Sequence, residues 1–447
     1  MRGIALVSVA LVAGMAATAA GVVGCGQAGN VAAARLDAQV PAGQLGRSVA
    51  GGYSFLGQMM DTYAGGATPR LVQSFTGGVL GRQHFTVSES YDDALLIDAY
   101  LAEGTPEGRS RAEVIGNGLL YVQANDPRHD GRIRAAYAPV PLLSPGDVTA
   151  TDPASDVGGM AWAGQALVQL YAATVSNAYL AGAEAIGNWV QACCRDTRGP
   201  GGYTGGVAAD GQHFTWKSTE HNIDLYALFR LLATETGDPE WSARAAWARH
   251  FIVAMWDPQQ GRFYIGTTAD GQTPNDSVRP EDVNTWSYLA LRDPSYAASL
   301  DWDVRHLAAT SGGRHGVSFC TGDRTGVWYE GTGHLADALE FRGGFWDWIH
   351  AASYLRDIHH AQASGLNGDG RGIIAASRDG LSDCSGGSLY ASLHTGATAW
   401  YILAAKRIDP FFLIPTPAVT PASTLAPAST LAPVPTLAPV PTLIPAS

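Results

Sequence analysis

Residues Trp216 to Asp224 read WKSTEHNID and place a glutamate, a histidine, an asparagine and an aspartate directly before an apolar helical pattern. The apolar residues that follow, including Leu225, Leu228 and Leu232, recur at helical spacing, so the stretch predicts the first turn of a buried helix. Only 15% of the chain is charged, and Lys217 is one of just two lysines. Proton-handling side chains concentrated at one helix start in such a chain indicate a functional site.

Composition sets the class of protein. The chain has 447 residues, of which 46% are hydrophobic, enough for a large buried core. Its formal net charge is -12, with a pI near 5.4. Nucleic-acid binding requires clustered Lys and Arg, which this chain lacks, so no nucleic-acid partner is expected.

Both ends of the chain differ from its middle. Residues 1–25 resemble a secretory signal that ends in a lipobox, with Cys25 as the lipidation site. An ordinary signal or a single-span anchor is the alternative. We therefore expect an exported protein, secreted or attached to the membrane through an N-terminal lipid. Residues 26–44 are an expected linker, and the Pro-, Thr- and Ala-rich segment 411–447 is an expected disordered tail.

Four further cysteines follow Cys25 in the chain. Cys193 and Cys194 are adjacent, whereas Cys320 and Cys384 lie in glycine-rich loops and are candidates for a disulfide, although the sequence leaves the connectivity open. No CxxC spacing suggests a metal site. We expect no metal and no cofactor.

Twelve helical patterns fill the region between the two ends. They cover 45–64, 91–103, 107–125, 156–175, 177–194, 218–236, 239–256, 280–291, 301–310, 330–342, 345–362 and 388–405. Short and long connections alternate between them, and the even-numbered helices are the more apolar. Helices joined in this way stack as hairpins in a closed ring, with all long loops on one face.

This organisation resembles that of the six-hairpin glycosidases, the (α/α)6 toroid superfamily that includes glucoamylases, several endoglucanases and unsaturated glucuronyl hydrolases. The resemblance rests on the helix count, the loop alternation and the segments YDDAL (91–95), STEHN (218–222) and WYEGTGH (328–334). It covers about residues 45–405 and identifies the superfamily rather than one family. It implies an all-α domain over 45–410, built from six helical hairpins with short β-hairpins in the long loops.

In such a ring the N-termini of the even-numbered helices meet at one end and line an acidic pocket. We expect the catalytic carboxylates to be Glu220, Glu330 and Asp92, although acidic residues in a first turn also serve as helix caps. The expected substrate-binding residues are Trp216, Lys217, His221, Asn222, Asp224, Trp286, Trp328, Tyr329, His334 and His394. Carboxylates bind or transfer protons, and aromatic rings stack on sugars.

These residue types fit glycosidic bond cleavage, which uses one protonated and one ionised carboxyl. We therefore expect an exported glycoside hydrolase acting on a poly- or oligosaccharide. Inverting chemistry is the expectation carried by the resemblance, and the sequence leaves open which carboxyl is the acid. The alternatives are a polysaccharide lyase with His221, Asn222 or Tyr226 as the base, a sugar epimerase using His221 and His334, and a non-catalytic surface protein that binds glycans.

Overall fold

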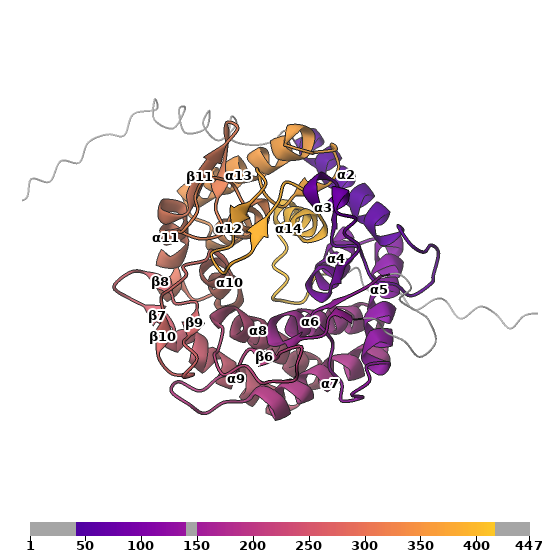
Figure 1. Cartoon of the computed structure of the whole chain (residues 1–447), viewed down its shortest axis with the longest axis vertical. Helices are drawn as coiled ribbons and strands as arrows, with labels where there is room; N and C mark the ends of the chain where they lie inside the picture. Colours follow the sequence, from indigo (N-terminus) through magenta and orange to yellow (C-terminus); the bar gives the residue numbers. More distant parts are fainter. Residues whose placement is uncertain (1–41, 140–149, 416–447) are drawn as a thin grey trace, which may run out of the picture.

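The computed structural model describes residues 42–139 and 150–415, and in these residues twelve long helices form two concentric rings (Figure 1). The inner helices are α4 (Ser90–Glu103), α6 (Val157–Thr174), α8 (Thr219–Thr236), α10 (Asp282–Leu291), α12 (Tyr329–Arg342) and α14 (Thr395–Lys406). The outer helices are α2 (Ala42–Met60), α5 (Pro106–Ala124), α7 (Asn177–Cys194), α9 (Pro239–Ala254), α11 (Ala298–His306) and α13 (Phe345–Ser364). A short helix α3 (Gly78–Arg82) and a 3-10 turn η1 (Pro294–Tyr296) complete the helical elements.

The inner ring is closed. Each inner helix packs against the next one along the chain, and α14 packs back against α4. The chain passes from each inner helix to the next outer helix through a short connection, such as Gly237 and Asp238 between α8 and α9. It returns to the inner ring through a long loop. The prediction of an (α/α)6 toroid with alternating loops is confirmed.

Sequence composition explains which helices lie inside. Inner helix α4 is buried on all sides, and even its aspartates Asp92, Asp93 and Asp98 are inaccessible to solvent. Outer helix α9 instead buries one face through Trp241, Ala248 and Phe251. A helix enclosed between an outer ring and the neighbouring inner helices needs small or apolar residues all round, whereas an outer helix needs only one apolar stripe.

The long loops carry short strands in seven small sheets. The strands are β1 (Phe75–Thr76), β2 (Ser88–Glu89), β3 (Ala136–Tyr137), β4 (Ala150–Asp152), β5 (Ser155–Asp156), β6 (Gly206–Val207), β7 (Trp256–Asp257), β8 (Arg262–Phe263), β9 (Gly266–Thr267), β10 (Pro274–Asn275), β11 (Ala308–Ser311), β12 (Arg314–Val317), β13 (Ile373–Ile374), β14 (Leu381–Ser382), β15 (Ser388–Leu389) and β16 (Leu393–His394). The residues just before each inner helix pair with the loop that leads to the next inner helix. Pairing of β16 with β1 closes this second circle and fixes the helix N-termini around one opening.

The opposite end of the ring is filled by residues 407–414, which turn inward after α14 (Figure 1). The Gln169 amide donates to the carbonyl of Phe412 and accepts from the N–H of Ile414, and Arg230 donates to the carbonyl of Phe411. Phe411 is completely buried. The packed domain therefore continues past residue 410, beyond the predicted start of the tail.

Several local expectations need correction. The last helix begins at Thr395 rather than at 388, because residues 388–394 contain β15 and β16. The S-x-x-D spacing of Ser90 and Asp93 predicts that Ser90 caps the second helix, but the Ser90 hydroxyl donates to the carbonyl of Arg134, and Glu89 is the residue before the helix. The predicted ninth helix, 301–310, is observed as α11 and ends at His306.

Other expectations are confirmed or lie outside the described residues. Cys320 and Cys384 form a disulfide. In residues 42–139 and 150–415, no helix is long and apolar enough to cross a membrane. The expected signal segment, its Cys25 and the tail beyond residue 415 are not among the described residues and stay predictions.

Candidate active site

A cavity of about 740 Å³ opens at the N-termini of the inner helices. Every inner helix contributes to it, either directly or through the residue just before its first turn. The polar lining includes Glu89, Tyr91, Asp156, Glu220, His221, Asp282, Glu330, His334, Tyr390 and His394. Aromatic side chains, among them Phe75, Trp162, Trp286 and Trp328, provide apolar wall surface. The predicted convergence of distant residues in one pocket is therefore observed.

Glu330 has more polar contacts with other side chains than any other carboxylate that lines the cavity in the described residues. The Tyr91 hydroxyl donates to its Oε1 at 2.7 Å, and the Trp400 indole N–H in turn donates to that hydroxyl at 2.8 Å. Burial favours the neutral acid, but the contacts from His334, His394 and Tyr91 outweigh this effect and lower the pKa of Glu330 below its ordinary value. Glu330 is therefore an ionised carboxylate although only 4% of its surface is exposed.

Two imidazoles flank Glu330. His334 Nε2 lies 3.8 Å from Glu330 Oε1, and its Nδ1 lies 3.1 Å from Glu281 Oε2. Burial opposes a charge on His334, yet Glu281 and Glu330 together raise its pKa to about 9. The imidazole thus joins a buried carboxylate to the carboxylate that lines the cavity.

His394 occupies the residue before α14. Its Nδ1 lies 3.3 Å from Glu330 Oε2, and its Nε2 lies 3.3 Å from Asp92 Oδ1. Although burial opposes the cationic form, these carboxylates raise the pKa of His394 to about 9. The N–H of Ala397 lies 3.2 Å from the same Nδ1. Because only an unprotonated Nδ1 accepts from that amide, the proton on Nδ1 decides which of the two contacts forms.

Glu220 lies in a contrasting environment. In the described part of the chain its carboxyl has no hydrogen bond and no ion pair. Burial, followed by the nearby carboxylates Asp282 and Asp156, raises the pKa of Glu220 well above its ordinary value. The surroundings therefore favour the neutral acid at Glu220 and the ionised carboxylate at Glu330.

Four further carboxyls line the cavity that the sequence analysis did not assign to the site: Glu89, Asp152, Asp156 and Asp282. The pKa values of Glu89 and Asp282 are raised. Burial, followed by Asp92, raises the pKa of Glu89 to about 7. Burial, followed by Glu281, raises the pKa of Asp282 to about 7 as well. Both begin inner helices, Glu89 just before α4 and Asp282 as the first residue of α10. That shared position is the signal that could have identified them.

Two glycines, Gly158 and Gly396, leave space for the side chains of His221, Asp92 and His394. A Cβ at Gly158 in α6 would lie 2.6 Å from the ring of His221, and a Cβ at Gly396 in α14 would lie 2.5 Å from Asp92 Oδ1. Contacts this short require the neighbouring atoms to move. The glycines therefore allow both histidines and Asp92 to occupy the helix starts.

Seven of the thirteen predicted substrate-contacting residues line the cavity. They are Glu220, His221, Trp286, Trp328, Glu330, His334 and His394. Asp92 does not line it but lies beneath His394, fully buried. Asp224 and Tyr329 are buried away from the opening, and Trp216 packs against Gly205 and His221. The predicted direct contact of these four residues with substrate is corrected to a supporting position.

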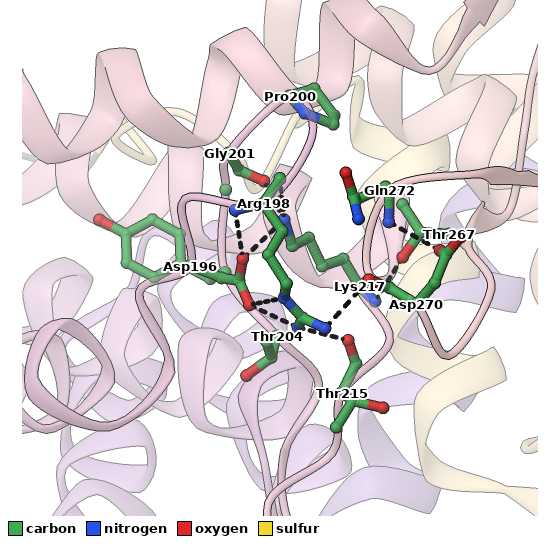
Figure 2. A network of polar contacts seen from close by, with 12 residues as sticks. Asp196, Arg198, Pro200, Gly201, Thr204, Thr215, Lys217, Thr267, Asp270 and Gln272 are labelled. Atoms are coloured by element: carbon green, nitrogen blue, oxygen red, sulfur yellow. Dashed lines mark hydrogen bonds and ion pairs between the residues drawn. The ribbon is translucent and has the colours of Figure 1, made fainter.

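Lys217 and Asn222 also turn away from the cavity, and both have structural partners. The Lys217 ammonium donates to the carbonyls of Arg198 and Gly201 at 2.7 and 2.8 Å and lies 3.2 Å from Asp196 (Figure 2). The Asn222 amide bonds both the N–H and the carbonyl of Tyr203. The predicted substrate-binding role is therefore replaced by a role in holding the loop between α7 and α8.

Comparison with solved structures identifies the fold. A D-mannose isomerase aligns with a TM-score of 0.60 and 13% identity, covering 82% of this chain and 98% of the other. A cellobiose 2-epimerase from Bacillus thermoamylovorans gives a TM-score of 0.60 at 10% identity, covering 85% and 100%. A glycosidase gives 0.57 at 13% identity, covering 83% and 99%. The sequence matches no protein-family model and no curated protein.

Proposed function

From the six-hairpin (α/α)6 toroid that this chain shares with sugar isomerases, epimerases and glycosidases, we propose that the protein is a carbohydrate-active enzyme and, more specifically, a glycoside hydrolase. Glu330 is the general base and Glu220 the general acid. The observation that carries this proposal is the contrast between two glutamates of one cavity: Glu330 contacts Tyr91 and two imidazoles, which lower its pKa, whereas burial and nearby carboxylates raise the pKa of Glu220. Environments that push the pKa values of two carboxyls apart are typical of acid–base pairs in glycoside hydrolysis.

The reaction follows from these charge states. Ionised Glu330 accepts a proton from a water molecule, and the water oxygen forms a bond to the anomeric carbon. Glu220 donates its proton to the leaving oxygen as the glycosidic bond breaks. Glu330 ends protonated and Glu220 ends ionised, and proton exchange with solvent restores both. His334 and His394 keep Glu330 ionised before the reaction.

Inversion of configuration is part of the proposal. Glu220 is on α8 and Glu330 on α12, and α10 lies between them in the inner ring. Carboxyls on inner helices that are not neighbours in the ring favour the wider spacing, about 6.5–9.5 Å, that leaves room for water in inverting enzymes. NMR of the first product anomer tests it: the inverted anomer is expected, and a retained anomer would contradict it.

A reducing-sugar screen with a broad glycan panel tests the hydrolase, with Glu220→Gln and Glu330→Gln as the variants. We expect release of reducing ends by the natural protein and loss of release in both variants. Undiminished release in both would contradict the assigned roles. Binding of a glycan without turnover would instead support the non-catalytic glycan-binding alternative.

A sugar isomerase or epimerase is the second candidate, and a specific observation supports it. His221 lines the cavity, burial lowers its pKa, and its buried Nδ1 has no hydrogen-bond partner among the described residues. A neutral imidazole of this kind is a suitable base for removing a proton from a sugar carbon. Incubation in D2O separates the candidates, because isomerisation incorporates deuterium at carbon and hydrolysis does not.

The lyase alternative has weaker support. A lyase acts on a uronate, whose carboxylate must be neutralised before the C5 proton leaves. In the described residues no Lys or Arg lines the cavity. The nearby imidazoles His334 and His394 already contact protein carboxylates. Absorbance from a new C=C bond in the products would reverse this preference.

Export and lipid attachment at Cys25 are also proposed. The supporting observation is the Cys320–Cys384 disulfide, because disulfides persist mainly in oxidising compartments. Mass spectrometry of the mature chain tests this proposal. A lipid-modified chain beginning at Cys25 is expected, and a Cys25→Ala variant should lack the lipid. An unprocessed N-terminus would contradict it.

A further inference from the structure

We propose that the sugar bound in this cavity carries a protonated amine, so that the substrates of the proposed hydrolase are oligosaccharides that contain an amino sugar with a free amine. The inference rests on the proposed function and adds the substrate class. Three observations support it: the charge of the lining, the missing protein partners of its carboxyls, and the way these groups are spread around the cavity.

The lining is strongly acidic. Six carboxyl side chains line the cavity, and no Lys or Arg does so among residues 42–139 and 150–415. The six are Glu89, Asp152, Asp156, Glu220, Asp282 and Glu330. The lining imidazoles with raised pKa values, His334 and His394, both contact Glu330. An anionic sugar would therefore meet repulsion, and a cationic sugar would meet attraction.

Most of these carboxyls have no ionic partner in the protein. Apart from Glu330, no lining carboxyl forms an ion pair within the described residues. Asp282 is only 5% exposed, and its single hydrogen bond is accepted by Oδ1 from the N–H of Val283. Among the described residues Asp282 has no cationic partner and no second hydrogen bond. A largely buried carboxylate without a cationic partner is stabilised by a ligand that supplies positive charge.

The cavity also has an apolar wall of aromatic side chains, among them Trp162, Trp286 and Trp328. Aromatic side chains together with a few polar groups are the usual lining of a site that binds a sugar ring. The ligand therefore combines a polar ring with a positive charge.

The spacing of the carboxyls favours an organic cation over a metal ion. In the described residues no group of three or more His, Cys, Asp or Glu is arranged to hold a metal. Glu89 precedes α4 and Asp282 begins α10, which is on the far side of the inner ring from α4. An ammonium group on a sugar ring needs only one or two carboxylates, so dispersed carboxyls suit it better than they suit a metal ion.

The raised pKa values of Glu89 and Asp282, both about 7, give the inference a second consequence. A nearby ammonium favours the ionised carboxylate, so binding at pH 7 should release protons to the buffer. A neutral sugar has no such effect. Calorimetry of binding in two buffers with different heats of ionisation measures the number of protons released.

The experiment compares matched methyl glycosides of gluco, galacto and manno configuration. Each 2-amino-2-deoxy glycoside is paired with its 2-hydroxy counterpart, and dissociation constants are measured by calorimetry at pH 7 and low salt. In at least one pair the amine should bind about tenfold more tightly, with proton release, because a hydrogen bond to a charged group contributes about 1.5–3 kcal/mol. If no amine binds more tightly than its neutral counterpart, the inference is overturned.

Variants test whether Asp282 and Glu89 cause the preference for the amine. Asp282→Asn or Glu89→Gln should lower the ratio of the two affinities several-fold, whereas Asp210→Asn, an equal charge change at an exposed turn, should not. An unchanged ratio in both cavity variants would overturn the inference. Because binding is measured without turnover, the reducing-sugar screen decides the proposed hydrolase separately.

Discussion

Two polar regions meet at the start of α8 and differ in how their groups are satisfied. Around Lys217, the ammonium, the Asp196 carboxylate and the Arg198 guanidinium all contact protein atoms (Figure 2). In the cavity, the Glu220 carboxyl and the Nδ1 atom of His221 have no hydrogen-bond partner among the described residues. Lys217 of the first region and Glu220 and His221 of the second come from one nine-residue stretch of sequence, 216–224.

The difference distinguishes residues that hold the fold from residues that are placed to act on a substrate. Polar groups that hold a loop are stabilised by saturating their hydrogen bonds, because an unpaired buried group costs free energy. Groups that act on a substrate must keep bonding capacity free and are stabilised only by ligand. At the start of α8, partner saturation distinguishes the structural Lys217 from the cavity residues Glu220 and His221. Four predictions test that comparison.

Glu330→Gln should have the largest effect. Losing the ionised base should lower kcat by about 10³-fold, a typical contribution of general acid–base catalysis. Thermal unfolding should change little, because the amide fills the same space. Glu340→Gln, on the same helix but outside the cavity, is the matched control. Comparable activity loss in the control would show that α12 itself had been disturbed.

Lys217→Met should act on stability alone. It removes the cation from Asp196 and leaves the carbonyls of Arg198 and Gly201 without their donor, which should cost about 3 kcal/mol of unfolding free energy. Denaturant titration measures the loss. Lys406→Met, at the exposed second lysine, should be neutral. A loss of turnover in Lys217→Met that exceeds the folded fraction would contradict the purely structural assignment.

Glu220→Gln should lower kcat by about 10²-fold and change its pH profile. Glu220 acts in its protonated form, so activity should fall as pH rises through its raised pKa. Glu330 must be ionised, so activity should also fall on the acid side, below the ordinary glutamate pKa. In the variant the alkaline limb should disappear. Persistence of that limb would assign it to another group.

The smallest effect concerns stability and pH. Asp98 is fully buried without a hydrogen bond in the described part of the chain, and burial raises its pKa well above the ordinary value. Above the ordinary aspartate pKa, and until the pH reaches the raised pKa, the folded chain binds a proton that the unfolded chain has lost, so stability falls as pH rises. Asp98→Asn should remove up to about 1.4 kcal/mol per pH unit of this slope.

Urea titrations at several pH values measure the slope for the natural protein and the variant. Asp270→Asn is the control, because hydrogen bonds from Thr273 and its neighbours lower the pKa of that exposed carboxyl. Both folded and unfolded chains are ionised at Asp270 above pH 5, so its replacement should leave the slope unchanged. An equal slope in Asp98→Asn would show that Asp98 ionises in the folded protein.

The ring could be predicted from the sequence because helix starts, apolar periodicity and loop alternation are local features. The direction of individual side chains could not be predicted where packing against distant residues determines it. Lys217 and Asn222 turn away from the cavity because the loop around Gly201 and Tyr203 offers them partners, which spacing alone does not reveal. The spacing of Leu389 and Leu393 predicts a helix over residues 388–394. These residues instead form β15 and β16, which pair with β14 and β13. The pKa values of Glu220 and Glu330 are shifted in opposite directions by burial and neighbouring groups, which only the folded ring defines.

The inward turn of residues 407–414 links completion of the cavity to the order in which the chain is synthesised. The ring centroid of Phe411 lies 5.2 Å from that of Trp162 and 5.7 Å from that of Trp286. The base of the cavity is therefore completed by the part of the described chain that leaves the ribosome last. Ring closure joins Ser48 to Tyr401 across 353 positions. Contacts of that range form late and slowly. A nascent chain therefore has no finished cavity until nearly the whole domain has been translated.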